Sequence, residues 1–229
     1  MGPRTMSIQN VLEQLLRSGT QQYDKAKQSG DLGKYGTGAA VGGALALLLG
    51  SKRGRSIGGK ALKLGSLAAV GALAWKVYQD HQAKSQAQAP ASAAGAPQSL
   101  PAPARFEALP APALEDHSRA MLMAMIAAAK SDGHMDDRER GLVKAELTRL
   151  DADPSTRQWV ETELRRPVEP AHVAAAARTP EMAAEIYLAS VLVTDEATTM
   201  ERAYLDQLAR DLNLAPSLKA DLEAKARAT

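Results

Sequence analysis

Five prolines divide the C-terminal half of the chain into short segments with helical periodicity. Pro112, Pro154, Pro170, Pro180 and Pro216 all stand near the start of such a segment, where the missing N–H of proline costs nothing. No segment alternates polar and apolar residues as a half-buried strand does. The sequence therefore predicts an all-α fold. The predicted helices cover residues 114–131, 136–150, 154–166, 170–178, 180–194, 198–212 and 216–228.

Composition supports closely packed helices. Aromatic residues make up only 3% of the chain, with one Phe, two Trp and five Tyr, so the core must be built from Ala, Leu, Val, Ile and Met. Asp153 and Thr179 directly precede two of the prolines and are expected to cap the helices that follow.

A glycine-rich apolar region precedes this helical half. Residues 35–51 form a run of 17 residues without a charge, bracketed by Lys34 and Lys52. A helix of that length reaches ~25 Å, slightly less than the hydrocarbon core of a bilayer. A second apolar stretch, residues 64–75, is shorter, and both contain Gly or Ala at four-residue spacing. Such small faces allow close helix contact in lipid, so we expect a membrane-associated helix or helical hairpin, or a homo-oligomer.

Four regions follow from these patterns. Residues 1–34 form an amphipathic N-terminal region, in which residues 7–18 have the apolar stripe of a short helix; that stripe fits either packing on neighbouring helices or an interfacial contact with lipid. Residues 35–82 form the membrane-associated segment. Residues 83–112 form a disordered Pro/Ala-rich linker, and residues 113–229 form the helical domain.

Charge separates the two halves of the chain. Residues 1–112 carry 13 Lys/Arg and 5 Asp/Glu, whereas residues 113–229 carry 15 and 21. A basic, apolar first half suits a lipid bilayer, and an acidic second half argues against nucleic acid as a partner. The absence of cysteine excludes thiolate metal sites and cysteine nucleophiles. Without a nucleophile–base pair or a phosphate loop, we expect no enzyme.

The orientation in a membrane depends on the basic loop between the two apolar stretches. Its cations are Lys52, Arg53, Arg55, Lys60 and Lys63, and the positive-inside rule keeps them cytoplasmic. If only residues 35–51 cross, the helical domain is cytoplasmic; if residues 64–79 cross, it is periplasmic. We expect a bacterial inner-membrane protein with a cytoplasmic domain, and the sequence leaves the periplasmic side open.

Two stretches of the helical domain are related. Residues 127–147 and 188–208 each contain a small-residue helix, an acidic turn and then Glu-Arg opening a new helix, which indicates a degenerate helix-turn-helix repeat. The phrases AAAKSDGHMDDRER and YLASVLVTDEATTMERAYLDQLARDLNL resemble the C-terminal domain of the YebE-like inner-membrane proteins, a family of unknown function. Its globular part has the TerB-like, tellurite-resistance-associated fold. The resemblance implies a bundle of about seven helices, membrane attachment and a stress-envelope context.

The same resemblance implies a divalent-metal site. TerB-like domains are thought to use acidic residues in these turns, which points to Asp132, Glu139, Asp195 and Glu201. Carboxylate oxygens suit Ca²⁺ or Mg²⁺. No EF-hand spacing supports the site independently.

Helix capping is the alternative interpretation of the first turn. Asp132-Gly133 has the form of a helix end, Asp136 and Asp137 could cap the next helix, and Glu139 would favour its dipole. Two functions remain open. One is a membrane-anchored, non-enzymatic adaptor or stress-associated envelope protein whose helical domain binds a protein partner. The other is a divalent-metal sensor or buffer.

Overall fold

The architecture is all-α, as predicted. The structure is a computed structural model that describes residues 6–14, 67–87, 111–133, 135, 137–194 and 198–228. In this part of the chain no strand is present, and residues Met6 and Ala152 form an isolated bridge. The labelled helices are α4 (Leu67–Ala87), α5 (Ala111–Ala129), α6 (Asp137–Arg149), α7 (Pro154–Arg165), α8 (Pro170–Ala174), α9 (Pro180–Val193), α10 (Thr199–Asp211) and α11 (Pro216–Ala228).

A helix is present at each of the seven positions predicted for the C-terminal half, although α8 ends at Ala174, and the two side-chain caps predicted from the sequence can be checked. Asp153 accepts a hydrogen bond of 2.8 Å from the backbone N–H of Thr156 at the start of α7. Thr179 accepts one of 3.2 Å from the N–H of Met182 at the start of α9. Both predicted caps are therefore confirmed.

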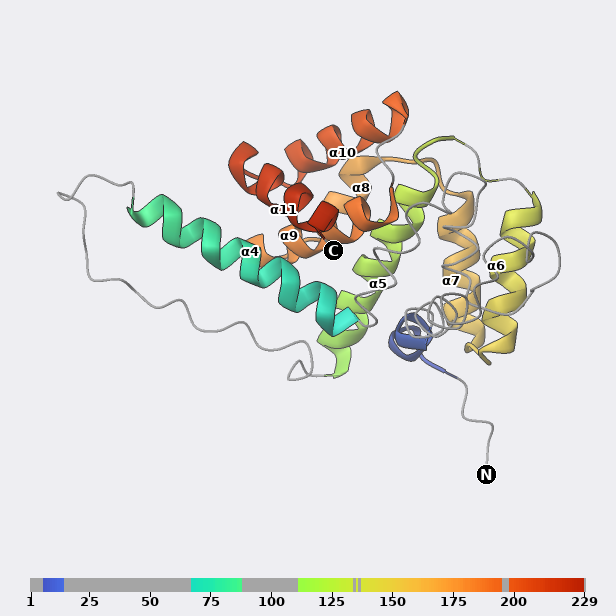
Figure 1. Cartoon of the computed structure of the whole chain (residues 1–229). Helices are drawn as coiled ribbons and strands as arrows, with labels where there is room; N and C mark the ends of the chain where they lie inside the picture. The colour runs from blue at the N-terminus through green and yellow to red at the C-terminus, as the bar shows by residue number, and fades with distance from the viewer. Residues whose placement is uncertain are drawn as a thin grey trace, which may run out of the picture.

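Helix α9 is the centre of the fold. Nearly every residue from Met182 to Val193 is buried, as expected for a helix that is apolar on all sides. Helices α4, α5, α10 and α11 pack around it (Figure 1). Its alanines and Ser190 allow these neighbours to approach closely, which suits a chain with few aromatic side chains.

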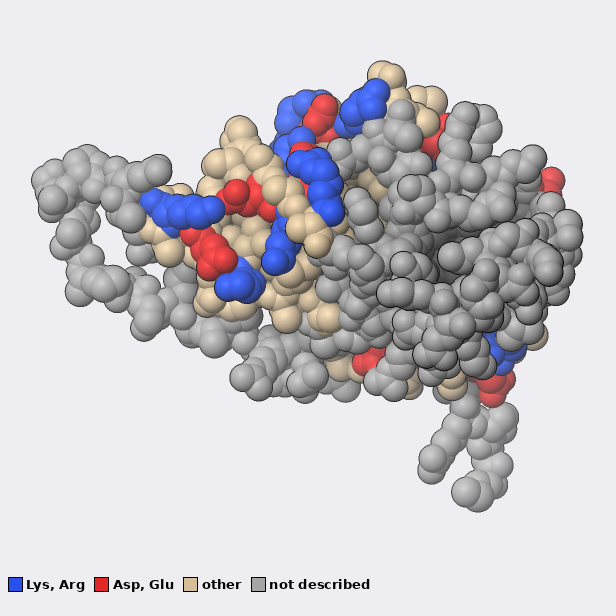
Figure 2. Space-filling view, viewed as in Figure 1, with Lys and Arg blue, Asp and Glu red and all other residues tan. Residues whose placement is uncertain are grey.

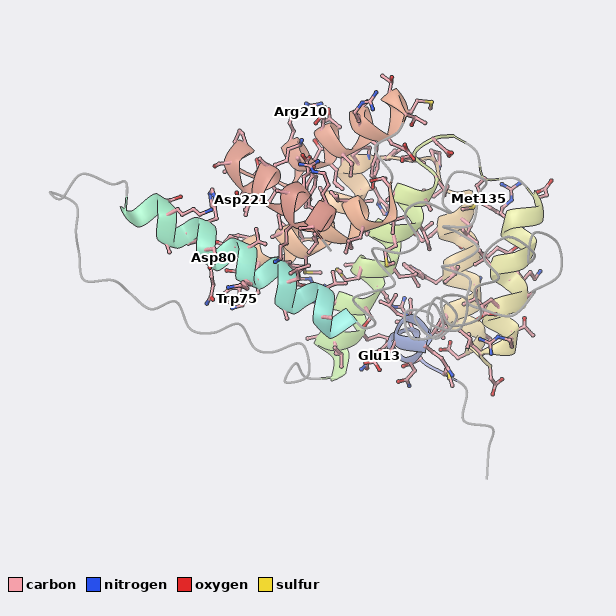
Figure 3. The ribbon with its side chains drawn as sticks, viewed as in Figure 1. Glu13, Trp75, Asp80, Met135, Arg210 and Asp221 are labelled. Atoms are coloured by element: carbon pink, nitrogen blue, oxygen red, sulfur yellow. The ribbon has the colours of Figure 1, made fainter. Side chains whose placement is uncertain are left out.

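Helix α4 belongs to the same bundle. It packs against α9 and α11 and buries Val70, Ala74, Val77 and Tyr78. At its far end, Lys84 Nζ lies 3.5 Å from a carboxylate oxygen of Asp221 on α11. Figure 3 shows Asp80 on α4 and Asp221 on α11, and Figure 2 shows that basic and acidic side chains alternate on this face.

This packing changes the interpretation of the second apolar stretch. Membrane association of residues 35–82 is not supported by the described end of that segment, because α4 uses its apolar face inside the bundle. None of the described helices is both long and apolar enough to cross a bilayer. The sequence pattern fits both environments, because small residues permit close helix contact in water as well as in lipid. Residues 35–51, the other expected span, lie outside the described residues.

The expected region boundaries shift accordingly. Helix α4 continues past residue 82, the expected end of the membrane segment, as far as Ala87. Helix α5 begins at Ala111, inside the expected linker of residues 83–112. The middle of that linker lies outside the described residues.

The N-terminal segment docks on the turn between α6 and α7. The N–H of Met6 donates to the carbonyl of Asp151 at 2.8 Å, and the N–H of Asp153 donates to the carbonyl of Met6 at 3.0 Å. Residues 8–14 are helical, and the side chains of Ile8, Val11 and Leu12 are fully buried. Of the two interpretations of this apolar stripe, packing on neighbouring helices is therefore the one observed.

Candidate functional site

The acidic turn after α5 has the geometry of a helix end. Gly133 adopts a positive φ of 79°, a conformation that glycine adopts without steric cost and that commonly ends helices. Asp132 precedes it and is half-buried. Glu139 lies in the first turn of α6, and its side chain is outside the described part of the structure. Helix α5 ends at Ala129, so Asp132 and Gly133 lie in the turn that follows it.

The second acidic turn caps α10. Glu201 and Thr198 form a reciprocal capping box: the backbone N–H of Thr198 donates to Glu201 Oε2 at 2.9 Å, and the N–H of Glu201 donates to Thr198 Oγ1 at 3.1 Å. This arrangement satisfies two N–H groups that the helix itself leaves unpaired. The carboxylate of Glu201 therefore has a structural role.

The structure does not show the four predicted metal ligands together. Asp195 and the side chain of Glu139 lie outside the described part of the chain. Among the side chains that the structure describes, no group of three or more His, Asp or Glu residues could hold a metal ion. The site formed by Asp132, Glu139, Asp195 and Glu201 stays a prediction.

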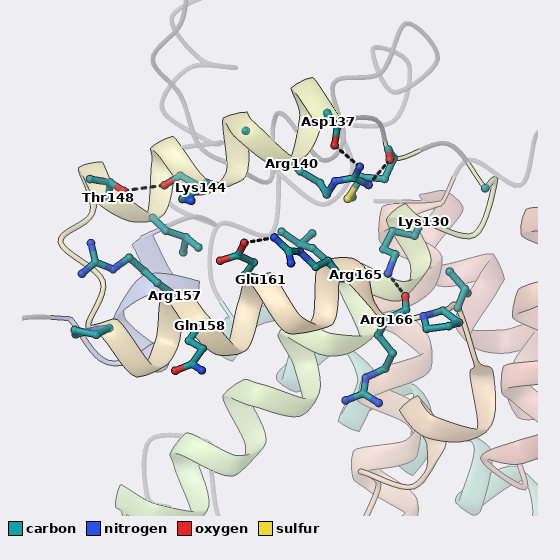
Figure 4. Close-up of a pocket in the computed structure, with 18 residues that line it drawn as sticks. Lys130, Asp137, Arg140, Lys144, Thr148, Arg157, Gln158, Glu161, Arg165 and Arg166 are labelled. Atoms are coloured by element: carbon teal, nitrogen blue, oxygen red, sulfur yellow. Dashed lines mark hydrogen bonds and ion pairs between the residues drawn. The ribbon is translucent and has the colours of Figure 1, made fainter.

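A ligand-sized cavity lies along the α6–α7 hairpin. Its volume is about 930 Å³, in the range of ligand-binding pockets. We call it the α6–α7 groove (Figure 4). Its described lining includes six cationic side chains, Lys130, Arg140, Lys144, Arg157, Arg165 and Arg166, and two acidic ones, Asp137 and Glu161.

Two of the cations are neutralised along their own helix. Arg140 Nη2 lies 2.5 Å from Asp137 Oδ1 at the start of α6. Arg165 Nη2 lies 2.6 Å from Glu161 Oε1 one turn earlier on α7. These i,i+3 and i,i+4 pairs account for both acidic residues of the lining.

A buried cluster closes one end of the groove. Lys130 is buried, and its ammonium donates to the carbonyl of Glu163 at 2.9 Å and to that of Arg166. Burial lowers the pKa of Lys130; Glu163 opposes this effect, and Arg140 and Arg166 add to it. The guanidinium of Arg166 in turn lies 3.2 Å from the Glu163 carboxylate. Lys130 thus caps the C-terminus of α7, where carbonyls lack helical partners.

Two cations of the groove remain available. Lys144 on α6 is exposed and Arg157 on α7 is half-buried. Within the described residues, neither side chain has a carboxylate partner. They extend from the two helices that form the walls of the groove (Figure 4). Among the described residues, the positive charge of these two side chains is therefore not compensated by a carboxylate.

Sequence reasoning missed this groove because charge composition does not reveal it. Residues 137–168 contain seven Lys/Arg and seven Asp/Glu, so the segment has no net charge. Folding separates the signs: Glu146 is buried and paired with Arg149, and Glu163 is buried beside Arg166. The spacing of Arg140 and Lys144, four residues apart on one helical face, was the available signal.

The described fold and groove define an all-helical protein with a cavity lined by cationic side chains. The chain belongs to the DUF533 family, described as a protein of unknown function, whose match covers residues 34–226. It is also similar to an uncharacterised protein from the ampR 5' region of Yersinia enterocolitica, with 26% identity over 114 residues, half of this chain and 82% of that protein. No solved structure matches the chain. A family of unknown function, as the resemblance implied, is thus confirmed.

Proposed function

We propose that this chain is a membrane-attached, non-enzymatic adaptor whose helical domain binds a protein partner through the α6–α7 groove. The observation that carries the proposal is a ligand-sized cavity in which Lys144 and Arg157 have no carboxylate partner among the described residues. Such charges give an interface its specificity and speed its association. A stress-associated role in the envelope is part of the proposal and follows from the resemblance alone.

The chemistry around the groove supports binding. Two buried charged residues hold the end of α7 beside the groove: Lys130 donates to the backbone carbonyl of Glu163, and the Glu163 carboxylate pairs with Arg166. Glu201 caps α10. These groups stabilise helix ends, which leaves the exposed cations as the chemically available part of the surface.

We also propose that α5 to α11 form a TerB-like bundle. The support is the resemblance, together with seven helices at the positions expected for it. The side-by-side packing of α5 and α9, the first helices of the two related stretches, fits an internal helix-turn-helix repeat.

The described segments before and after residues 35–51 both contact the folded domain, which limits how residues 35–51 could attach to a membrane. Met6 is hydrogen-bonded to Asp151 and Asp153, and α4 packs on α9. Segments of one folded unit lie on the same side of a bilayer, so a single crossing between residues 14 and 67 is incompatible with this unit. We propose attachment of residues 35–51 without a complete crossing, at the inner membrane.

The basic loop supports the cytoplasmic side. Lys60 and Lys63 directly precede α4, which is part of the helical bundle. Cations next to a membrane segment favour the cytoplasmic face, so we propose that the whole folded unit lies in the cytoplasm. Reporters active in one compartment only, fused before residue 6 and after residue 228, should both report the cytoplasm. Opposite results from the two ends would overturn the attachment without crossing.

Affinity capture tests the adaptor. The full chain and its Lys144→Glu, Arg157→Glu double variant are captured from detergent-solubilised membranes, and the bound proteins are compared. We expect partners that are retained by the native chain and lost by the double variant. Arg210→Glu on α10 is the matched control, because Arg210 is exposed and lies far from Met135 of the groove (Figure 3). Equal capture by the native chain and the double variant would overturn the proposal.

A further inference from the structure

The walls of the α6–α7 groove combine free charge with apolar surface. Lys144 and Arg157 supply the charge. The accessible apolar surface comes from Met135 and Val168, which are only partly buried, whereas Leu147 and Leu164 belong to the buried core beneath the lining. A small inorganic anion would use only the charges, whereas an occupant with both carboxylates and apolar side chains would use the whole surface.

The dimensions of the groove fit a helix. Helix α6 has 13 residues and α7 has 12, so each wall is roughly 18–20 Å long at the rise of an α-helix. Two adjacent helices of this length form a hydrophobic groove in which a third, amphipathic helix can lie. An acidic amphipathic helix would match this shape and charge.

The remaining segments of this chain do not supply such a helix. Residues 15–66 carry nine Lys/Arg and two Asp/Glu, and residues 88–110 carry one of each. The first segment has the same sign of charge as the groove, and the second has no net charge. Charge complementarity therefore favours a separate partner.

An anionic membrane surface is a poorer match. Residues 113–229 carry 15 Lys/Arg and 21 Asp/Glu, so the domain as a whole is repelled by anionic headgroups. The free cations lie in a concave cavity with apolar walls, which suits a defined ligand better than a flat layer of lipid.

We propose that the α6–α7 groove binds an acidic amphipathic helix of a partner protein, with its carboxylates at Lys144 and Arg157 and its apolar side chains on Met135 and Val168. This inference rests on the proposed adaptor function and specifies the chemistry of its partner.

Fluorescence anisotropy with a designed peptide tests it. The probe is a labelled peptide of the length of α6, 13 residues, with Leu on one helical face and Glu on the flanking positions. Against the full chain in detergent, we expect saturable binding that Lys144→Glu with Arg157→Glu weakens by at least about tenfold. Arg210→Glu should leave the affinity unchanged.

Two further comparisons identify what is recognised. A peptide with every Glu replaced by Gln should lose the binding, and one with every Leu replaced by Ser should weaken it. Because the charge reversals could disturb the fold, a Lys144→Gln, Arg157→Gln variant with an unchanged circular dichroism spectrum is measured in parallel, and it should also bind more weakly. Equal affinity for the Glu and Gln peptides overturns the inference.

Vesicles of phosphatidylcholine and phosphatidylglycerol form the last arm. One outcome is that the native chain binds vesicles but not the peptide, and that the charge-reversed variant no longer binds vesicles. The groove would then recognise lipid headgroups, and the inference would be wrong. If the peptide does not bind but partner capture still requires Lys144 and Arg157, the adaptor function stands and the acidic helix is overturned. If neither the peptide nor a partner depends on these residues, both proposals fail.

Discussion

The bundle around α9 has charged groups that are paired between helices as well as within them, and the α6–α7 hairpin differs in this respect. In the bundle, charged and polar groups meet partners across helices: His117 Nε2 lies 2.6 Å from Glu185 Oε2, and the Tyr187 hydroxyl donates to Glu223 at 2.7 Å. In the hairpin, several ion pairs lie within one helix, and Lys144 and Arg157 have no carboxylate partner among the described residues.

This difference suggests that residues near α9 and residues of the α6–α7 groove contribute to different properties. Pairing charges between helices fixes their relative positions, whereas pairing within a helix leaves the surface open to another molecule. Apolar burial also differs between the bundle and the hairpin, because α9 is enclosed by its neighbours whereas α6 packs mainly on α7. We therefore expect substitutions near α9 to affect unfolding and substitutions in the groove to affect binding.

The largest expected effect is at the centre of the bundle. Leu188 is fully buried on α9, so Leu188→Ala removes apolar contacts and leaves a cavity. It should lower the free energy of unfolding by about 2–5 kcal/mol, measured by chemical denaturation followed by circular dichroism. Met200→Ala is the control, because Met200 is 56% exposed on α10 and its truncation should cost at most about 0.5 kcal/mol. Equal effects at the two positions would contradict the central role of α9.

The next effect tests whether α4 belongs to the bundle. Ala74 is fully buried on the face of α4 that packs in the fold, so Ala74→Leu should overpack this contact and cost about 1–3 kcal/mol. Ala72→Leu, on an exposed position of the same helix, should cost little. If both changes leave unfolding unaltered but reduce recovery in the membrane fraction, α4 acts as a membrane segment instead.

Helix α4 also shows where sequence reasoning reached its limit. The helices of the C-terminal half were predictable because proline and capping residues mark their starts, as at Asp153-Pro154 and Thr179-Pro180. The partner of an apolar face is not encoded locally, so the burial of Val70 and Ala74 against other helices could not be separated from burial in lipid.

The candidate site was less predictable than the fold. Glu201 was expected from the resemblance as a metal ligand, whereas the capping box with Thr198 was readable from Thr-x-x-Glu spacing. The groove depends on which faces of α6 and α7 meet, and on the burial of Glu146 and Glu163 beside arginines. A neutral segment acquires a cationic face only through that tertiary packing.

A smaller, pH-dependent effect is expected at the base of the hairpin. Burial raises the pKa of Asp153, but hydrogen bonds from Ser155 and Thr156 outweigh it and hold the pKa below its ordinary value of 3.8. The carboxylate therefore adds stability above pH 3.8, and this contribution is lost as the pH falls toward the lower, folded-state pKa. Asp153→Ala should cost about 1 kcal/mol at neutral pH and less in acid.

The matched variant at this position is Asp153→Asn. Asparagine keeps an acceptor for the N–H of Thr156 and is as good an N-cap as aspartate, but it does not titrate. The variant should therefore retain most of the stability of the native chain at neutral pH. It should lose the part of the acid destabilisation that comes from protonation of Asp153. Denaturation midpoints measured at neutral pH and near pH 3 check this, and an unchanged acid dependence in Asp153→Asn would assign the titration to another group.

The smallest effect on stability, and the sharpest contrast with Leu188, is expected in the groove. Lys144 is exposed, so Lys144→Glu should change the free energy of unfolding by no more than about 0.5 kcal/mol, while it reduces the capture of partners by the full chain. Lys144→Gln should show an intermediate loss of capture, because it removes the positive charge without adding a negative one. A loss of capture that tracked unfolding, rather than the charge at residue 144, would mean that the hairpin is structural like α9 and not a binding surface.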